Sequence, residues 1–243
     1  MIKGIYRIAD TLVEIDSLYQ EVHDLCSDYR CDGVPQFIIT TMPSDIDYER
    51  MKSKEEDLYE GNPIRIFSDS YLETLAVYRK LVEELLSQDI LLFHGSAIAV
   101  DEEGYLFTAK SGTGKSTHTR LWRKLFKERA VMINDDKPLI KIEENQVIIY
   151  GTPWDGKHHI STNINVPLKA ICLLERSPHN NIHRLTFTQA FPALLKQCYR
   201  PTDIDKMEKT MFLLKELGTK VPLYKLECNT REDAAKVAYE GMQ

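Results

Sequence analysis

Short apolar runs separated by turn residues fill the first seventy residues, and a longer helical pattern follows them. Runs rich in Ile, Leu and Phe and bounded by Gly or Pro are typical of strands. The stretch 45–59 is charged and is interpreted as a solvated loop. Residues 71–87 repeat their apolar side chains on one helical face, which predicts an amphipathic helix. The strands predicted before this helix lie at 5–8, 12–15, 37–41 and 64–67.

The rest of the chain alternates between strand and helix patterns. Two apolar runs, 90–100 and 105–108, flank a turn cluster and predict a β-hairpin. The apolar residues of 116–126 recur on one helical face. The fold class is therefore α/β, with a strand-rich N-terminal region, 1–88, and a core, 89–243; one continuous domain is the alternative. Further strands are predicted at 130–134, 138–142, 146–150 and 168–174, and helices at 188–199, 203–217 and 230–239.

The run 109–116, AKSGTGKS, lies between the hairpin and the 116–126 helix. It matches the phosphate-binding pattern G-x-x-x-x-G-K-[ST], except that Ala109 replaces the first Gly. Backbone N–H groups of such a P-loop cradle a triphosphate, and the positive end of the helix dipole favours an anion. Lys115 would reach the β- and γ-phosphates, and the Ser116 hydroxyl would hold Mg²⁺. The predicted nucleotide-binding residues are Ser111, Gly112, Thr113, Gly114, Lys115, Ser116 and Thr117.

Two adjacent acids, Asp135 and Asp136, directly follow the strand predicted at 130–134. In P-loop enzymes an Asp at the end of a neighbouring strand holds Mg²⁺, and a catalytic base orients the nucleophile. Successive strand residues point to opposite sides, so the two carboxylates need not do the same job. Beside a P-loop this pair makes phosphoryl transfer the leading hypothesis; an exposed turn is the alternative for an isolated pair.

The order Phe-His-Gly, hairpin, Ser-Gly-Thr-Gly-Lys-Ser, helix, strand and Asp-Asp resembles the catalytic core of the HPr kinase/phosphorylase family. That core is itself similar to the nucleotide site of phosphoenolpyruvate carboxykinase. The resemblance is specific over 90–140 and looser to about residue 226. It implies a P-loop core with a mixed sheet, which uses ATP and Mg²⁺ to phosphorylate a hydroxyl group, with serine the expected acceptor.

Residue by residue, the resemblance implies that His94 lies near the transferred phosphate. It implies that Lys115 is the P-loop lysine and that Ser116 binds Mg²⁺. One acid of the pair would take the proton from the acceptor serine, and the other would bind the metal. The base is assigned to Asp135 and the metal to Asp136, and the opposite division is the alternative.

The chain departs from this family in two places. The Gly-Leu-Gly-like second signature of HPr kinases is not found, and YGTPWDGKHH, 150–159, stands in roughly its place. The N-terminal region does not match the family's separate N-terminal domain, so we expect a peptide, another protein or a small molecule as acceptor. Lys157 is a candidate for neutralising the transferring phosphoryl group and Asp155 for meeting the acceptor, with an ordinary surface loop as the alternative. Arg176 and Arg200 are candidates for clamping a phosphate.

The composition argues against some classes of binding partner and agrees with the phosphoryl-transfer hypothesis. The net charge is −6 and no Lys/Arg-rich run occurs, which argues against nucleic acid as a partner. The five Cys show no C-x-x-C and no metal-ligand spacing, which is typical of free thiols in a reducing cytoplasm. Neither a signal peptide nor an apolar run of membrane-spanning length is found, so a cytoplasmic location without a membrane partner is expected.

A nucleotide-binding switch is the competing functional class. Such a protein would hydrolyse ATP slowly and signal through a partner, and it predicts nucleotide binding without a phosphorylated acceptor. A scaffold with a degenerate P-loop is suggested only by Ala109, which costs little where the backbone is not at positive φ. The sequence leaves open the acceptor, the donor (ATP, GTP or pyrophosphate), a reverse phosphorylase reaction, and whether the chain forms a homo-oligomer such as the hexamers of its relatives.

Overall fold

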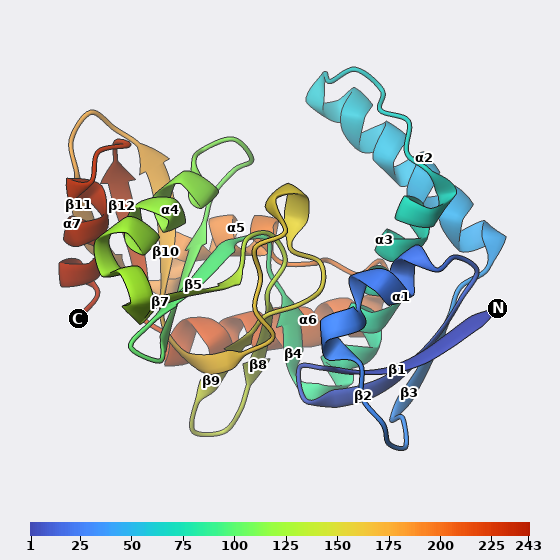
Figure 1. Cartoon of the computed structure of the whole chain (residues 1–243). Helices are drawn as coiled ribbons and strands as arrows, with labels where there is room; N and C mark the ends of the chain where they lie inside the picture. Colours follow the sequence, from blue (N-terminus) through green and yellow to red (C-terminus); the bar gives the residue numbers. More distant parts are fainter. The chain divides into compact units, whose positions relative to one another are not determined.

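The computed structural model describes the backbone of all 243 residues and every side chain except those of Glu60 and Lys157. The chain forms two compact units, Met1–Glu84 and Leu85–Gln243 (Figure 1). Each unit is described by itself.

Over its described residues the first unit holds a three-stranded sheet in the order β1-β2-β3. Its elements are β1 (Ile2–Ile8), β2 (Thr11–Ser17), α1 (Glu21–Leu25), η1 (Ser27–Tyr29), β3 (Phe37–Thr40), α2 (Pro43–Glu60) and α3 (Asp69–Leu85). β1 and β2 form an antiparallel hairpin, and Ala9 and Asp10 take positive φ in its two-residue turn. β3 runs parallel to β2. Three of the four predicted strands and the predicted amphipathic helix are therefore confirmed.

The loop predicted at 45–59 is wrong, because this stretch forms most of α2. The helix packs on α3 through charged side chains rather than through an apolar stripe. Asp45 pairs with Lys80 at 2.7 Å, and Glu49 pairs with Arg79 at 2.6 Å. A helix whose inner face is made of ion pairs has a weak apolar period, so the hydrophobic pattern did not reveal it.

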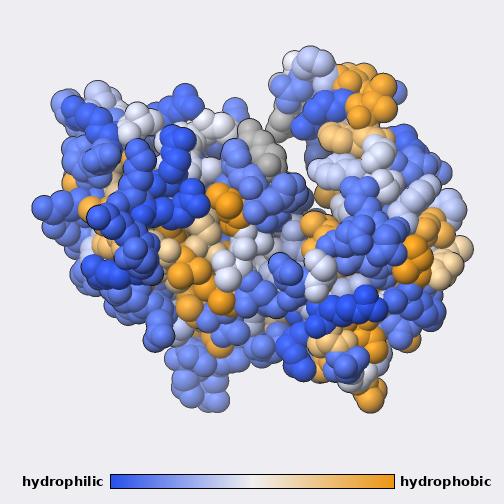
Figure 2. Space-filling model, viewed as in Figure 1, coloured by the Kyte–Doolittle hydropathy of each residue, from blue (hydrophilic) through white to orange (hydrophobic). Residues whose placement is uncertain are grey.

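The strand predicted at 64–67 is also wrong, because the described backbone of this segment has no regular structure. Arg65 fixes it to α2 by donating from its backbone N–H and its guanidinium to the buried carboxylate of Asp57. Ile64 and Ile66 alternate as in a strand, yet both are exposed. Hydrophobic residues are also visible on the surface in the region of α2 (Figure 2). The two long helices outweigh the strands, so the expected strand-rich N-terminal region is in fact mostly helical.

The described residues of the second unit form a nine-stranded mixed sheet. Its strands are β4 (Ile90–Leu92), β5 (Ser96–Val100), β6 (Glu103–Thr108), β7 (Ala130–Asn134), β8 (Leu139–Ile142), β9 (Val147–Tyr150), β10 (Asn165–Arg176), β11 (Asn181–Leu185) and β12 (Leu223–Cys228). Their order is β4-β8-β9-β10-β6-β5-β7, and β12 and β11 continue from β10. The long β10 is central, because it pairs antiparallel with β9 and then runs parallel to β6 and β12. The predicted mixed α/β class is confirmed.

Helices cover both faces of this sheet (Figure 1). They are α4 (Lys115–Phe126), α5 (Phe187–Gln197), α6 (Ile204–Lys220) and α7 (Asp233–Gly241), with short turns η2 (Leu86–Gln88), η3 (Lys127–Arg129) and η4 (Gly156–His158). On one face α4 and α7 enclose a core around Trp122, into which Ile98 and Phe107 project. On the other face α5 and α6 cover Ala99 and Leu106. Neighbouring strand residues thus enter opposite cores, as expected for strands buried on both sides.

The hairpin predicted before the P-loop is present as β5 and β6, and it is shorter than expected. The apolar run 90–100 is interrupted at His94 and Gly95, so β4 pairs with β8 while β5 pairs with β6. The turn consists of Asp101 and Glu102, both at positive φ. This interruption separates His94 from both strands and leaves its side chain in a connecting segment.

Several boundaries near the C-terminus differ from the predictions. α5 is capped by Thr186 rather than Thr188, so Pro192 lies inside the helix and not in its first turn. α6 continues through Gly218, where a stop was predicted. α7 begins at Asp233, after the predicted start at residue 230. β11 and β12 were not predicted. β11 is an edge strand with exposed positions and carries little apolar alternation.

All five cysteines are free thiols in the described structure, as predicted. Burial raises the pKa of both Cys26 and Cys198 to about 12, so neither is a thiolate at neutral pH. None of the described helices combines the length and the apolar character that crossing a membrane requires.

Candidate functional site

The loop 109–114 joins β6 to α4, at the position predicted for the P-loop. Gly112 and Gly114 have φ angles of 76° and 122°, which L side chains rarely adopt, so both positions require Gly. Ala109 is not among the described residues with positive φ, so its Cβ adds no strain of this kind. The loss of the first Gly of the motif is therefore compatible with this loop.

Lys115 opens α4 and lies folded back on the loop. Its side chain is buried, and its Nζ donates to the carbonyl oxygen of Ala109 at 3.1 Å. Burial lowers the pKa of Lys115, while the charges of Asp136 and Asp135 oppose that effect. Ser116 follows in the first turn of α4. A cation, a hydroxyl and the positive end of a helix dipole thus lie beside the loop, which is the chemistry that a phosphate requires.

Arg176, at the end of β10, contacts the backbone of the loop. Its guanidinium donates to the carbonyl oxygen of Thr113 at 3.1 Å and to that of Gly112. The arginine predicted to clamp a phosphate therefore contacts the loop backbone in this structure. Arg200, the other candidate, follows α5 and is exposed.

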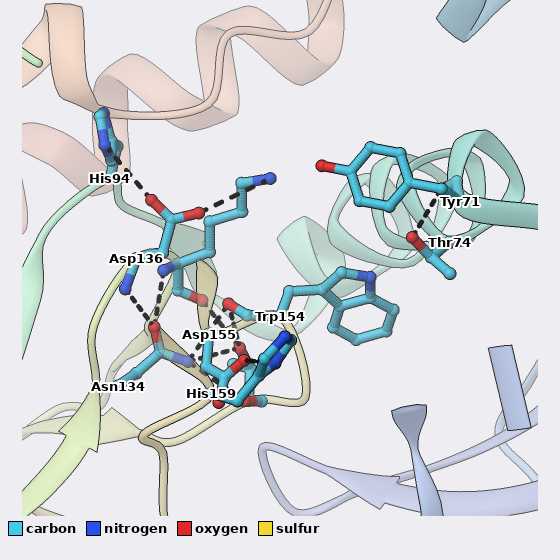
Figure 3. Close-up of polar contacts among 10 residues, drawn as sticks. Tyr71, Thr74, His94, Asn134, Asp136, Trp154, Asp155 and His159 are labelled. Atoms are coloured by element: carbon cyan, nitrogen blue, oxygen red, sulfur yellow. Dashed lines mark hydrogen bonds and ion pairs between the residues drawn. The ribbon is translucent and has the colours of Figure 1, made fainter. Parts of the chain in front are cut away.

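His94 lies between β4 and β5 with its backbone fixed on both sides. Its N–H donates to the Gln197 carbonyl at 2.7 Å, and its carbonyl accepts from the Thr108 hydroxyl at 2.8 Å. The side chain points to the acid pair, with Nε2 at 3.4 Å from Asp136 Oδ1 (Figure 3). Burial and the charge of Lys115 lower the pKa of His94 more than Asp136 raises it, so the ring is neutral at pH 7.

The second carboxylate, Asp135, has different neighbours. Its Oδ1 accepts from the Ser96 hydroxyl at 2.5 Å, and Ser96 Oγ lies 2.9 Å from the Thr119 hydroxyl. The Thr119 hydroxyl is in turn 3.3 Å from the Ser116 carbonyl oxygen. This buried network runs from Asp135, directly after β7, through Ser96 on β5 to Thr119 on α4, and so links Asp135 to the helix that carries Ser116.

Asn134 fixes the turn that carries the acid pair, and sequence reasoning missed its role. Its Oδ1 accepts from the backbone N–H groups of Asp136 and Lys137 at 2.8 and 2.6 Å. Its Nδ2 donates to the Thr152 hydroxyl at 2.9 Å and to the Trp154 carbonyl at 3.3 Å (Figure 3). A fully buried amide is expected to use its donors and acceptors in this way. The Asn134 side chain thereby holds the 150–159 loop against the Asp-Asp turn.

Asp155, predicted to meet an acceptor, is buried and bonded within its own loop. His159 Nδ1 lies 3.1 Å from one of its oxygens (Figure 3). Ser161 Oγ donates to the other oxygen at 3.0 Å. The loop packs closely on the acid pair, because a Cβ added at Gly156 would lie 2.9 Å from Asp136 Cβ. Contact between Asp155 and an acceptor stays a prediction. The Lys157 side chain lies outside the described part of the structure, so its role stays a prediction as well.

The oxygen donors beside the 109–116 loop are of the kind that Mg²⁺ prefers. The described residues contain no cluster of three or more His, Cys, Asp or Glu side chains able to hold a metal ion. Mg²⁺ usually takes one or two protein oxygens and completes its octahedron with waters and substrate phosphates. The Ser116 hydroxyl and one carboxylate of the acid pair are oxygen ligands of that kind.

No family model matches the chain, and no curated protein matches it. Among solved structures, the chain is similar to the HPr(Ser) kinase/phosphatase from Coxiella burnetii, with 14% sequence identity and a TM-score of 0.34. The match covers 62% of this chain and 92% of that chain. A likeness at this level is too distant to assign an activity, so the function is argued from the residues of the site.

Proposed function

We propose that the protein is a phosphotransferase that uses Mg²⁺ and ATP to move the γ-phosphoryl group to a hydroxyl, with a serine of a peptide, a protein or a small molecule as the expected acceptor. The observation that carries the proposal is the convergence of three kinds of group on one P-loop. Lys115 supplies a buried positive charge. The neutral His94 lies 3.4 Å from the carboxylate of Asp136. The second carboxylate, Asp135, accepts a hydrogen bond from Ser96, whose hydroxyl contacts Thr119 on α4.

The transfer requires that the donor phosphates are held and that the acceptor hydroxyl loses its proton. The acceptor oxygen forms a bond to the γ-phosphorus as the bond from that phosphorus to the β–γ bridging oxygen breaks, and ADP leaves. Lys115 and the loop amides would stabilise negative charge on the phosphate oxygens. The proton of the acceptor hydroxyl passes to a carboxylate of the acid pair.

We assign Asp136 as the base that accepts this proton and Asp135 as the carboxylate that would bind Mg²⁺. This is the alternative division left open by the sequence. Asp136 keeps 29% of its side chain exposed and has His94 beside it, so an acceptor can reach it. Asp135 is 7% exposed and is linked through Ser96 and Thr119 to the α4 turn of Ser116. Mg²⁺ bound there would offset charge on the phosphates.

The proposal is tested by following ADP release from Mg²⁺-ATP with and without acceptors. The panel holds HPr, serine-bearing peptides, free serine and small alcohols. We expect one acceptor class to accelerate ADP release at least about tenfold and to gain one phosphate per ADP, as a kinase requires. ADP release that no acceptor changes, matched by free phosphate, would instead identify the nucleotide-hydrolysing switch.

We expect Ser96→Ala to lower the transfer rate about tenfold and to raise the Mg²⁺ concentration needed for half-maximal rate. The variant leaves Asp135 without its buried donor, and a hydrogen bond to a charged group is worth about 1.5–3 kcal/mol. The measurement is the initial rate as a function of Mg²⁺. The matched control is Thr210→Ala, which also removes a fully buried hydroxyl, but one on α6. An unchanged Mg²⁺ dependence in Ser96→Ala would refute this positioning role.

A further inference from the structure

The loop between β9 and β10 is fixed at three places to the residues around the acid pair. Asn134 holds the first part of the loop, as described above. Near the end of the loop, the Thr162 N–H donates to the Ile133 carbonyl at 3.2 Å. Between these two anchors the loop packs on Asp136, because a Cβ added at Gly156 would lie 2.9 Å from the Asp136 Cβ. The loop therefore borders the carboxylate that we assign as the base.

Asp155 lies in this loop with both of its carboxylate oxygens engaged. Only 9% of its side chain is exposed. One oxygen lies 3.1 Å from His159 Nδ1, and the other accepts from the Ser161 hydroxyl at 3.0 Å. An acceptor molecule would have to break one of these bonds to reach Asp155, and a buried carboxylate that loses a hydrogen bond is destabilised. Contact with an acceptor is therefore expected from a neighbouring side chain rather than from Asp155 itself.

His159 is the exposed member of this group. Its side chain is 75% exposed, although its Nδ1 lies against the buried carboxylate. The residue follows η4 with a φ angle of 47°, and its ring lies beside Asp155, four residues earlier (Figure 3). A carboxylate can only accept, so Nδ1 carries the donated proton, and Nε2 of the neutral ring is a hydrogen-bond acceptor. None of the described residues bonds to this Nε2.

We infer that His159 Nε2 binds the acceptor molecule and that Asp155 is a positioning residue, which orients the ring. This inference rests on the proposed function, because Asp136 beside the loop must receive the hydroxyl proton. Nε2 recognises a hydrogen-bond donor that lies next to the phosphorylated hydroxyl. Since serine is the expected acceptor, that donor is its nitrogen, either the amino group of the free amino acid or the backbone N–H of a peptide. The acceptor class is thereby narrowed from any hydroxyl compound to one with an N–H beside the hydroxyl.

Substitutions at two adjacent histidines test this contact. His159→Ala removes the acceptor-binding nitrogen. His158→Ala is the matched control, because His158 is also exposed and its side chain makes no hydrogen bond with the described residues. We expect kcat/KM for the acceptor to fall about three- to tenfold in His159→Ala, as for the loss of one hydrogen bond, with the KM for Mg²⁺-ATP unchanged. His158→Ala should change neither value. The measurement is the initial rate with donor and acceptor varied independently.

Asp155→Asn tests the positioning role. The amide can donate to His159 Nδ1, which moves the ring proton to Nε2 and turns the accepting atom into a donor. We expect kcat/KM for the acceptor to fall as in His159→Ala. The double variant should lose no more than either single variant, since Asp155 acts through His159. Losses that multiply in the double variant would show that Asp155 only supports the loop, and would overturn the positioning role.

Matched acceptors test the recognised group directly. Free serine is compared with 3-hydroxypropionate, which keeps the hydroxyl and the carboxylate and lacks the amino group. A serine-bearing peptide is compared with the same peptide carrying N-methylserine, which has no backbone N–H. The wild-type protein should prefer the N–H-bearing member by about three- to tenfold in kcat/KM, and His159→Ala should lose this preference. The pair that shows the preference identifies the free amino acid or the peptide as the acceptor.

The outcomes distinguish this inference from the proposed function. Equal use of both members of each pair by the wild-type protein, or an unchanged preference in His159→Ala, would overturn the inference and leave the phosphotransferase assignment standing. Phosphorylation confined to small alcohols without an N–H would do the same. Failure of the wild-type protein to phosphorylate any acceptor would overturn both. A preference for the N–H-bearing acceptor that His159→Ala loses and His158→Ala keeps supports both.

Discussion

Lys115→Ala should lower phosphoryl transfer about 10²–10³-fold or more while leaving the fold intact, because it removes a cation preorganised to stabilise charge on the transferring phosphoryl group. The side chain is buried against the Ala109 carbonyl and lies within the field of both carboxylates of the acid pair. Its loss removes no apolar packing on the scale of a core residue, so the unfolding temperature should change little. The measurements are the rate of label transfer from γ-labelled ATP and the thermal unfolding midpoint.

Lys110→Ala is the matched control, because Lys110 is an exposed lysine of the same loop. It should retain most of the activity, since charge exposed to water stabilises a transition state less than buried charge. Equal losses in the two variants would mean that the loop needs only net positive charge. Near wild-type transfer by Lys115→Ala would remove the P-loop from the mechanism.

The second large effect is expected at the acid pair. Asp136→Asn should lower kcat about 10²–10⁴-fold without changing the Mg²⁺ dependence, because it removes the group that accepts the hydroxyl proton. Asp135→Asn should also abolish transfer at ordinary Mg²⁺ concentrations, and raised Mg²⁺ should restore part of the rate. The measurement is kcat over a range of Mg²⁺ concentrations, with Asp203→Asn, a change at the exposed cap of α6, as control.

These two variants also discriminate between the two divisions of roles. If Asp135→Asn loses kcat at every Mg²⁺ concentration while Asp136→Asn shifts the Mg²⁺ requirement, then Asp135 is the base, as first assigned from the sequence. If neither variant loses activity, the acid pair serves only to hold the turn that Asn134 organises.

Short-range signals in the sequence were sufficient to predict the elements around the 109–116 loop. Gly112 and Gly114 take the positive φ angles that other residues rarely adopt, and the apolar period of 116–126 matches α4 closely. The strand predicted at 130–134, which leads into Asp135 and Asp136, coincides with β7. In each case the deciding information lies within about ten consecutive residues.

The contacts that organise the acid pair could not be predicted, because their partners are distant in the sequence. Ser96 lies 39 residues before Asp135, and Asn134 reaches Thr152 across a separate hairpin. Nothing in the sequence around Ser96 or Asn134 indicates which residue each of them bonds to. The α2 helix was missed for a similar reason. Its inner face carries Glu49, which pairs with Arg79 thirty residues later, so the contact leaves no local apolar pattern.

The central claim is transfer of a phosphoryl group to a hydroxyl, and the most direct measurement is the fate of the γ-phosphate. Purified protein with Mg²⁺ and γ-labelled ATP is incubated with each acceptor, and the labelled product is identified by mass spectrometry. The account predicts label on a hydroxyl of one acceptor class, lost in Lys115→Ala and kept in Lys110→Ala. Label found only as free phosphate, at a rate that no acceptor changes, would contradict it.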